Sequence, residues 1–126
     1  MIFGFPWEDK KLWLDSAAWL SEQKFDFLKI HQLHVVKHTA LAKEYERNPF
    51  QLLSYQDYFD LMIPFLENLS PDFVIQRLFG EAPMHTIIAP NWGIRNYDLL
   101  EMFDKELEKN DSWQGKKFIR SASAND

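Results

Sequence analysis

The sequence contains no cysteine and only four glycines among its 126 residues. Without cysteine the chain forms no disulfide, supplies no thiolate to a metal ion and cannot ligate an iron–sulfur cluster in the usual way. Four glycines leave no room for a phosphate-binding P-loop. The sequence also lacks a run of about twenty apolar residues and a basic, apolar leader, so it predicts neither a membrane span nor a signal peptide. We therefore expect a cytoplasmic protein.

The overall charge limits the class of partner. The formal net charge is −5, which argues against a protein that binds nucleic acid through bulk positive charge. Apolar residues make up 46% of the chain and aromatic residues 16%, which is enough for one well-packed domain. We assign this domain to residues 1–113, and residues 114–126 to a polar tail that we expect to be disordered.

Apolar runs at 2–5, 25–36 and 73–78 predict three strands, with helical periodicity between and after them. Four residue types that favour helix starts precede these helical segments. They predict helices from Asp9 to about Gln23, over 40–47 after Thr39, from Ser54 to Leu69, and over 97–109 after Asn96. Pro64 removes one backbone hydrogen bond and should kink the third helix.

The alternation of strands and helices predicts an α/β fold, with about three parallel strands joined by crossover helices. Three parallel strands leave both outer edges unpaired. The first predicted strand begins at once, at Ile2, and an apolar strand of this kind normally has neighbours on both sides. We therefore expect the chain to be a piece of a longer protein or to borrow its neighbours from a partner.

Strand alternation divides the predicted strand 25–36 into two faces. Leu28, Ile30, Gln32 and His34 share one face, where Leu28 and Ile30 suit packing under a helix. Lys29 and His31 share the other. A lysine is rarely buried without a partner, so it either forms an ion pair with an acidic neighbour or faces a ligand. Arg77, at the end of the third strand, either binds a carboxylate or phosphate or pairs with Glu81. Lys29, His31 and Arg77 are therefore candidates for a substrate-facing site.

Three histidines, His31, His34 and His38, have the spacing H-x2-H-x3-H. On a helix they would lie near one face and could ligate a metal ion, as in a small metal-dependent enzyme. The surrounding Ile, Leu and Val residues favour a strand, on which His31 and His34 point apart. We therefore assign no residue to a metal site.

Several stretches, in the same order along the chain, resemble the second half of radical S-adenosylmethionine (SAM) proteins. The likeness is to an uncharacterised family related to the elongator-type and coproporphyrinogen-oxidase-like enzymes. It spans roughly Ile2 to Lys117. The stretches that carry it are Ile2 to Glu8, Lys29 to Lys37, Thr39, Leu41-Ala42, Tyr45, Leu53-Ser54, Tyr58, Ile75 to Leu78, Glu81 to Pro83, Ala89 to Trp92 and Trp113 to Lys116.

The resemblance implies a barrel of six or more β/α units, of which this chain holds about the last three or fewer. It implies that Ile2 and Gly4 lie beside the SAM adenine and that Glu8 supports the turn between them and the helix. It also places Lys29, His31 and Arg77 toward the barrel mouth.

The chain departs from the family pattern at several places. Trp7 stands where the family has glycine in the turn and would narrow the approach to the cofactor. His38 also replaces a glycine and would strain the loop if that position has a positive φ. The family's three cluster-binding cysteines, in a C-x3-C-x2-C-like loop after the first strand, are absent.

We therefore expect a carboxy-terminal portion of a radical SAM enzyme, whose full-length form cleaves SAM reductively with a [4Fe–4S] cluster. The missing amino-terminal half of the barrel is its expected partner, and we expect neither cofactor to be bound by this chain alone. The elongator-like kinship suggests a nucleic-acid substrate, which the acidic composition does not support. The alternative is a non-catalytic α/β module that acts through an exposed sheet edge, as in a homodimer.

Overall fold

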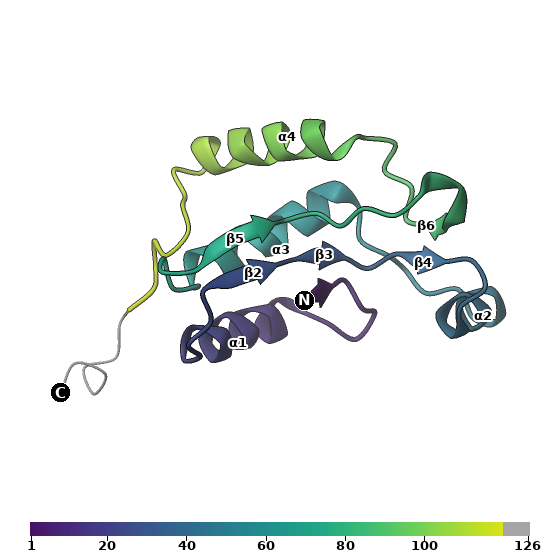
Figure 1. The fold of residues 1–126 in the computed structure, drawn as a ribbon, viewed down its shortest axis with the longest axis horizontal. Helices are drawn as coiled ribbons and strands as arrows, with labels where there is room; N and C mark the ends of the chain where they lie inside the picture. The colour runs from purple at the N-terminus through teal and green to yellow at the C-terminus, as the bar shows by residue number, and fades with distance from the viewer. Residues whose placement is uncertain (120–126) are drawn as a thin grey trace.

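A computed structural model describes residues 1–119 and shows an α/β fold with four α-helices (Figure 1). The expected α/β class is confirmed. The elements, in chain order, are β1 (Ile2–Phe3), α1 (Lys10–Ser21), β2 (Phe27–Lys29), β3 (His31–Gln32), β4 (Val35–Val36), α2 (Ala40–Arg47), α3 (Tyr55–Glu67), β5 (Val74–Arg77), the 3-10 turn η1 (Met84–Thr86), β6 (Ile87–Ala89) and α4 (Asn96–Lys109).

The first three helices begin at the predicted residues. The side chains of Asp9, Thr39 and Ser54 each accept a hydrogen bond from a backbone N–H in the first turn, at 2.8, 3.1 and 3.1 Å. The fourth helix begins one residue earlier than predicted, because Arg95 rather than Asn96 is its N-cap. Helix α3 continues through Pro64 and ends at Glu67, and the predicted kink stays a prediction.

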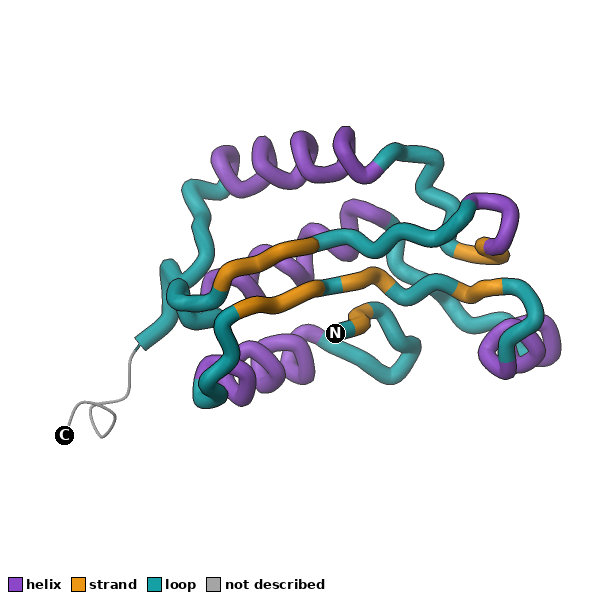
Figure 2. Tube along the Cα trace, viewed as in Figure 1, coloured by secondary structure: helices purple, strands orange, loops and turns teal. Residues whose placement is uncertain are grey.

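The chain from Phe27 to Gln32 lies between two parallel neighbours, β1 and β5. Its successive backbone amides point to opposite edges. His31 N donates to Met1 O at 2.8 Å, whereas Ile30 N donates to Arg77 O at 2.7 Å. The order across the strands, which are orange in Figure 2, is therefore β1, then β2 with β3, then β5, and their arrows in Figure 1 all point toward the same end of the molecule.

One face of these strands is covered by helices and the other is open to solvent. Leu28 and Ile30 are buried in the same core as the inward side chains of α1, α3 and α4. Helix α3 packs against α1 and also against α4. Phe27 and Lys29 point the other way and are exposed. We call this second surface the open face; it carries Ile2, Phe27, Lys29, His31, Val74 and Arg77.

The strands are shorter than predicted, and one pairing was not foreseen. The predicted strand 25–36 is divided into β2, β3 and β4, and the predicted strand 2–5 is only Ile2–Phe3. β6 forms inside 81–95, a stretch that we expected to be irregular, and pairs with β4 in the antiparallel sense, with Val35 opposite Ala89. The described residues thus form three two-stranded sheets and no closed barrel. The third sheet anchors the chain that follows β5 beside the carboxyl end of β3.

Aromatic rings join the strands to the helices in the core. The ring of Phe3 in β1 lies 4.1 Å from that of Trp13 in α1, and Tyr58 in α3 lies 5.6 Å from Phe79 after β5, measured between ring centroids. Phe103 of α4 packs on Phe59 at 5.2 Å. Large buried rings contribute strongly to core stability because each removes a large apolar area from water. This packing fixes the ends of the strands against the helices.

The chain after α4 returns to the carboxyl end of α3. Gly115 N donates to Leu66 O at 2.9 Å, and the Gln114 side chain donates to Ser70 O at 2.9 Å. The buried Glu67 carboxylate accepts from Ser112 Oγ at 2.9 Å. Part of the segment assigned to a polar tail therefore has hydrogen-bond partners, and the assignment from residue 120 onward lies outside the described residues. Among the described helices, none combines the length and the apolar character needed to cross a lipid bilayer.

Candidate functional site

The turn after β1 is fixed by one carboxylate. Gly4 N and Phe5 N both donate to Glu8 Oε1, at 2.5 and 2.6 Å. Gly4 has a φ of +112°, a conformation that residues with a side chain rarely adopt. Trp7 is 72% exposed and stacks on Phe5 with 4.8 Å between ring centroids. Ile2, Gly4 and Glu8 are thus brought together at the carboxyl end of β1, beside the open face.

The structure brings Lys29, His31 and Arg77 together on the open face. Lys29 lies opposite Arg77 in the pairing of β2 with β5. Simple alternation would have placed Arg77 with Ile75 on the covered face. The register shifts after Leu28, and this irregularity turns Arg77 toward the open face.

The charged side chains of this cluster are both cationic. Partial burial and the nearby positive charges of Arg77 and Lys29 lower the pKa of His31, so its ring favours the neutral form. Ion pairs with Glu81 or another carboxylate were the structural alternative for these residues. Within residues 1–119, none of the ion pairs includes Lys29 or Arg77. Two cationic side chains and one neutral imidazole therefore face solvent together, an arrangement suited to an anionic group.

Gly80, just beyond β5, is held from both sides. A Cβ at this position would lie 2.1 Å from His31 Nδ1, so the imidazole occupies the space that a side chain would need. On the other side, the buried amide of Gln32 accepts from Gly80 N at 2.7 Å and donates to Gly80 O at 3.5 Å. The ends of β3 and β5 are therefore connected through side chains beyond their backbone pairing.

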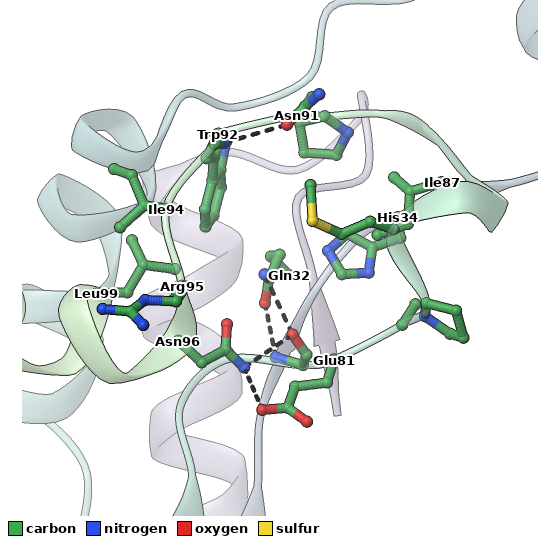
Figure 3. A pocket seen from close by; sticks show the side chains of 16 residues that line it. Gln32, His34, Glu81, Ile87, Asn91, Trp92, Ile94, Arg95, Asn96 and Leu99 are labelled. Carbon is green, nitrogen blue, oxygen red and sulfur yellow. Dashed lines mark hydrogen bonds between the residues drawn. The ribbon is translucent and has the colours of Figure 1, made fainter.

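A cavity of about 680 Å³ lies where β3 and β5 end, beneath the chain from 80 to 96 (Figure 3). Ligands in parallel α/β folds commonly bind beyond the carboxyl ends of the strands. Its polar lining includes Gln32, His34, Glu81 and Asn96, and its apolar lining includes Trp92. The Trp92 indole N–H donates to Leu53 O at 3.0 Å, which fixes the orientation of the ring.

Sequence reasoning missed this cavity. It assigned Gln32 and His34 to the strand face that packs under a helix, and it considered Asn96 only as a helix cap. Two polar residues at positions expected to be buried were the available signal, because buried polar groups need partners. The chain that covers the cavity was expected to be irregular, and nothing in its sequence showed where β6 would attach.

The described residues contain no group of three or more His, Cys, Asp or Glu side chains arranged to hold a metal ion. His31 lies in β3 and His34 lies between β3 and β4, so neither is on a helix, as the strand interpretation predicted, and His38 has a φ of +65° in the loop after β4. The three-histidine alternative gains no support from this geometry.

Comparison with known proteins adds independent information. Residues 25–109 match the family model described as the radical SAM C-terminal domain. The chain is 34% identical over 120 residues to the uncharacterized protein YtqA of Bacillus subtilis. This match covers 95% of this chain and 37% of YtqA. It is 32% identical over 121 residues to the uncharacterized protein MJ0486 of Methanocaldococcus jannaschii, covering 95% of this chain and 38% of that protein.

A third relative, the protein YhcC of Escherichia coli, is 25% identical over 109 residues, covering 86% of this chain and 35% of YhcC. The chain thus spans little more than a third of the length of the curated relatives that it matches.

Proposed function

Because the chain belongs to the radical SAM C-terminal domain family, we propose that it forms one arc of the β/α barrel of a radical SAM enzyme. In this arrangement the open face is turned toward the barrel interior and the helices form the outer layer. The observation that carries the proposal is the parallel order β1, β2 with β3, β5, with helices on one face only. The wall of a β/α barrel has this construction.

The residues of the chain fit SAM in part and do not fit the cluster. No cysteine is present to ligate iron, so the [4Fe–4S] cluster would be held by a segment outside this chain. Ile2 is half exposed on the open face and offers an aliphatic surface to a purine ring, next to the turn held by Glu8. In the family, SAM and the cluster together supply a 5′-deoxyadenosyl radical.

The role of this chain would be to bind SAM and the substrate and to orient them. Ile2 and Gly4 would line the adenine site, while Glu8 fixes the turn that carries them. Lys29, His31 and Arg77 would face the substrate and favour one with an anionic group, because no carboxylate in the described part of the chain pairs with the two cations. The acidic overall charge gives no support to a nucleic-acid substrate.

The direct test uses the genomic sequence immediately upstream of Met1. We expect an in-frame segment with a C-x3-C-x2-C sequence. Expressed together with this chain and reconstituted without oxygen, it should yield a brown, oxygen-sensitive protein that binds SAM. A colourless product after reconstitution would contradict the proposal. The chain alone should bind SAM with a dissociation constant above about 10 μM, because it lacks most of the site.

Two glycine variants of the assembled protein test the assigned SAM site. Gly4→Ala should weaken SAM binding about tenfold or more, because the turn must change its backbone conformation. Gly93→Ala is the matched control: Gly93 also has a positive φ, +66°, but a Cβ there meets nothing within 4 Å and the residue is not part of the turn after β1. Equal loss of SAM binding in both variants would argue against a role for the Gly4 turn.

A second candidate function rests on the sheet edges. Within residues 1–119, β1 and β5 each pair with a strand along one edge only. An unpaired edge can add a strand from another chain, as in a homodimer. Size-exclusion chromatography with light scattering distinguishes the candidates, since a compact monomer of the chain alone would disfavour edge pairing.

A further inference from the structure

The cavity at the ends of β3 and β5 is distinct from the open face. Even-numbered residues of the strand that runs into β3 point toward the helices, and Gln32 and His34 line the cavity from this side (Figure 3). At about 680 Å³ it lies within the size range of small-molecule sites. Most of its wall is apolar, with Met84, Ile87 and Leu99 among the lining residues. This composition favours a ligand with an apolar surface.

The polar groups of the cavity divide into those already bonded and those still available. Both ends of the Gln32 amide bond to Gly80. Asn96 Nδ2 donates to Gly80 O and to Glu81 Oε1, each at 3.3 Å. Because both of these partners are acceptors, the amide of Asn96 is oriented, and its Oδ1 remains as an acceptor.

His34 is the second available group. Its ring is half buried, and residues 1–119 offer it no hydrogen-bond partner. Burial, with a smaller contribution from His31, lowers the pKa of His34, so the ring is neutral near pH 7. A neutral imidazole carries one donor and one acceptor and can complement either kind of group on a ligand.

The charged lining residues do not favour an anion. Arg95 pairs with Asp98, with 3.2 Å between nitrogen and oxygen, and its side chain is 85% exposed. Glu81 is exposed and already accepts from Asn96. Neither residue supplies an unpaired buried charge, so an ionised ligand would lose hydration without gaining a partner.

We propose that this cavity binds an uncharged, planar nitrogen heterocycle, whose ring packs against the apolar wall and whose exocyclic amino group donates to Asn96 Oδ1, with a second hydrogen bond to His34. Its lining does not include Ile2, Gly4 or Glu8, and it needs neither SAM nor the cluster. The 126-residue chain by itself is therefore sufficient for the test.

Adenine and purine form a matched pair of probes, because they differ by one amino group. We expect adenine to bind the 126-residue chain with a dissociation constant of about 1 mM or lower, and purine to bind about three- to tenfold more weakly. Nitrogen-15 NMR titration reports both affinities and the residues affected, which should include Gln32, His34 and Asn96.

His34→Phe removes the hydrogen bond, keeps an aromatic ring of similar size and should weaken adenine binding about three- to tenfold. His85→Phe is the control: His85 lies on the same covering chain, is exposed and does not line the cavity. It should leave binding within about twofold of the original chain. Melting curves verify that each variant folds, and the comparison of the two probes needs no variant.

Three results would overturn the proposal. They are equal affinity for adenine and purine, chemical-shift changes at Ile2 and Gly4 in place of the cavity residues, and tighter binding of inorganic phosphate than of adenine. None of them bears on whether the assembled protein holds a cluster, so the failure of this proposal is distinguishable from the failure of the proposed function.

Discussion

At the residue scale, Gly80 shows how a single missing side chain shapes the site. The His31 imidazole occupies the position of the absent Cβ, while the Gln32 amide holds the backbone of Gly80 from the other side. Because Gly80 has no positive φ, the requirement for glycine there is steric. The identity of His31 and the identity of Gly80 are therefore physically coupled.

Gly80→Ala should lower the free energy of unfolding by about 2 kcal/mol, because the new methyl group overlaps the imidazole. The same substitution in a His31→Ala background should cost at least about 1 kcal/mol less, since the conflicting ring is gone. Urea denaturation of the four proteins in this double-mutant cycle gives the coupling energy. Additive effects would show that the ring moves aside without cost.

His38 confirms an expectation drawn from the family resemblance, in which glycine occupies its position. Its φ of +65° is the left-handed conformation that strains a residue with a side chain. His38→Gly should therefore raise the free energy of unfolding by about 0.5 kcal/mol, the relieved strain being partly offset by the greater flexibility of the unfolded chain.

Lys37→Gly is the control for this substitution, because Lys37 is an exposed neighbour and is not among the residues with positive φ. It should lower the free energy of unfolding by about 0.5–1 kcal/mol. Chemical denaturation measures both. A loss of stability in His38→Gly as large as in Lys37→Gly would contradict the strain interpretation.

At the element scale, the starts of the first three helices were predictable and the strand ends were not. Asp9, Thr39 and Ser54 act through hydrogen bonds within three residues, which the local sequence specifies completely. The division of the predicted strand 25–36 depends instead on which neighbour is available at each position, β5, β1 or β6. Those neighbours are distant in sequence. The local sequence likewise does not predict the register shift that turns Arg77 outward.

The cap of α3 can be tested with two serines. Ser54→Ala should lower the free energy of unfolding by about 1 kcal/mol, because the Asp57 N–H loses the oxygen that it bonds at 3.1 Å. Ser16→Ala in α1 should be neutral or slightly stabilising, since Ser16 Oγ only donates to the Leu12 carbonyl within the helix. Thermal melting compares them, and similar losses in both variants would count against a capping role.

At the scale of the whole molecule, the open face is the side of the strands that no described helix covers. Exposed apolar side chains on it, Phe27 at 59%, Val74 at 55% and Ile2 at 50%, flank the cationic pair Lys29 and Arg77. The predicted alternation of side chains explains why Lys29 and His31 lie here, whereas Arg77 lies here because of the register shift after Leu28. The sequence alone did not predict the cavity, because it forms between β3 and a chain segment about fifty residues away that has no periodic pattern.

If the open face lines a barrel, Phe27→Ser should weaken association with the upstream segment about tenfold or more, because the buried ring contributes about 2 kcal/mol. The stability of the chain alone should change by less than about 0.5 kcal/mol, because Phe27 is already exposed. Tyr97→Ser is the control: Tyr97 is 76% exposed on α4, in the layer of helices. Association is measured by co-purification and titration, and an equal loss in both variants would oppose the barrel arrangement.

The part of the covering segment around β6 is attached through its backbone. β6 pairs with β4, and Lys37 N donates to Thr86 O at 2.8 Å. Main-chain bonds of this kind are open to almost every amino acid, so side chains such as Met84 and Ile87 can be exchanged without displacing the segment. Selectivity at this end of the molecule can therefore diverge through point changes while the scaffold that presents it is inherited intact.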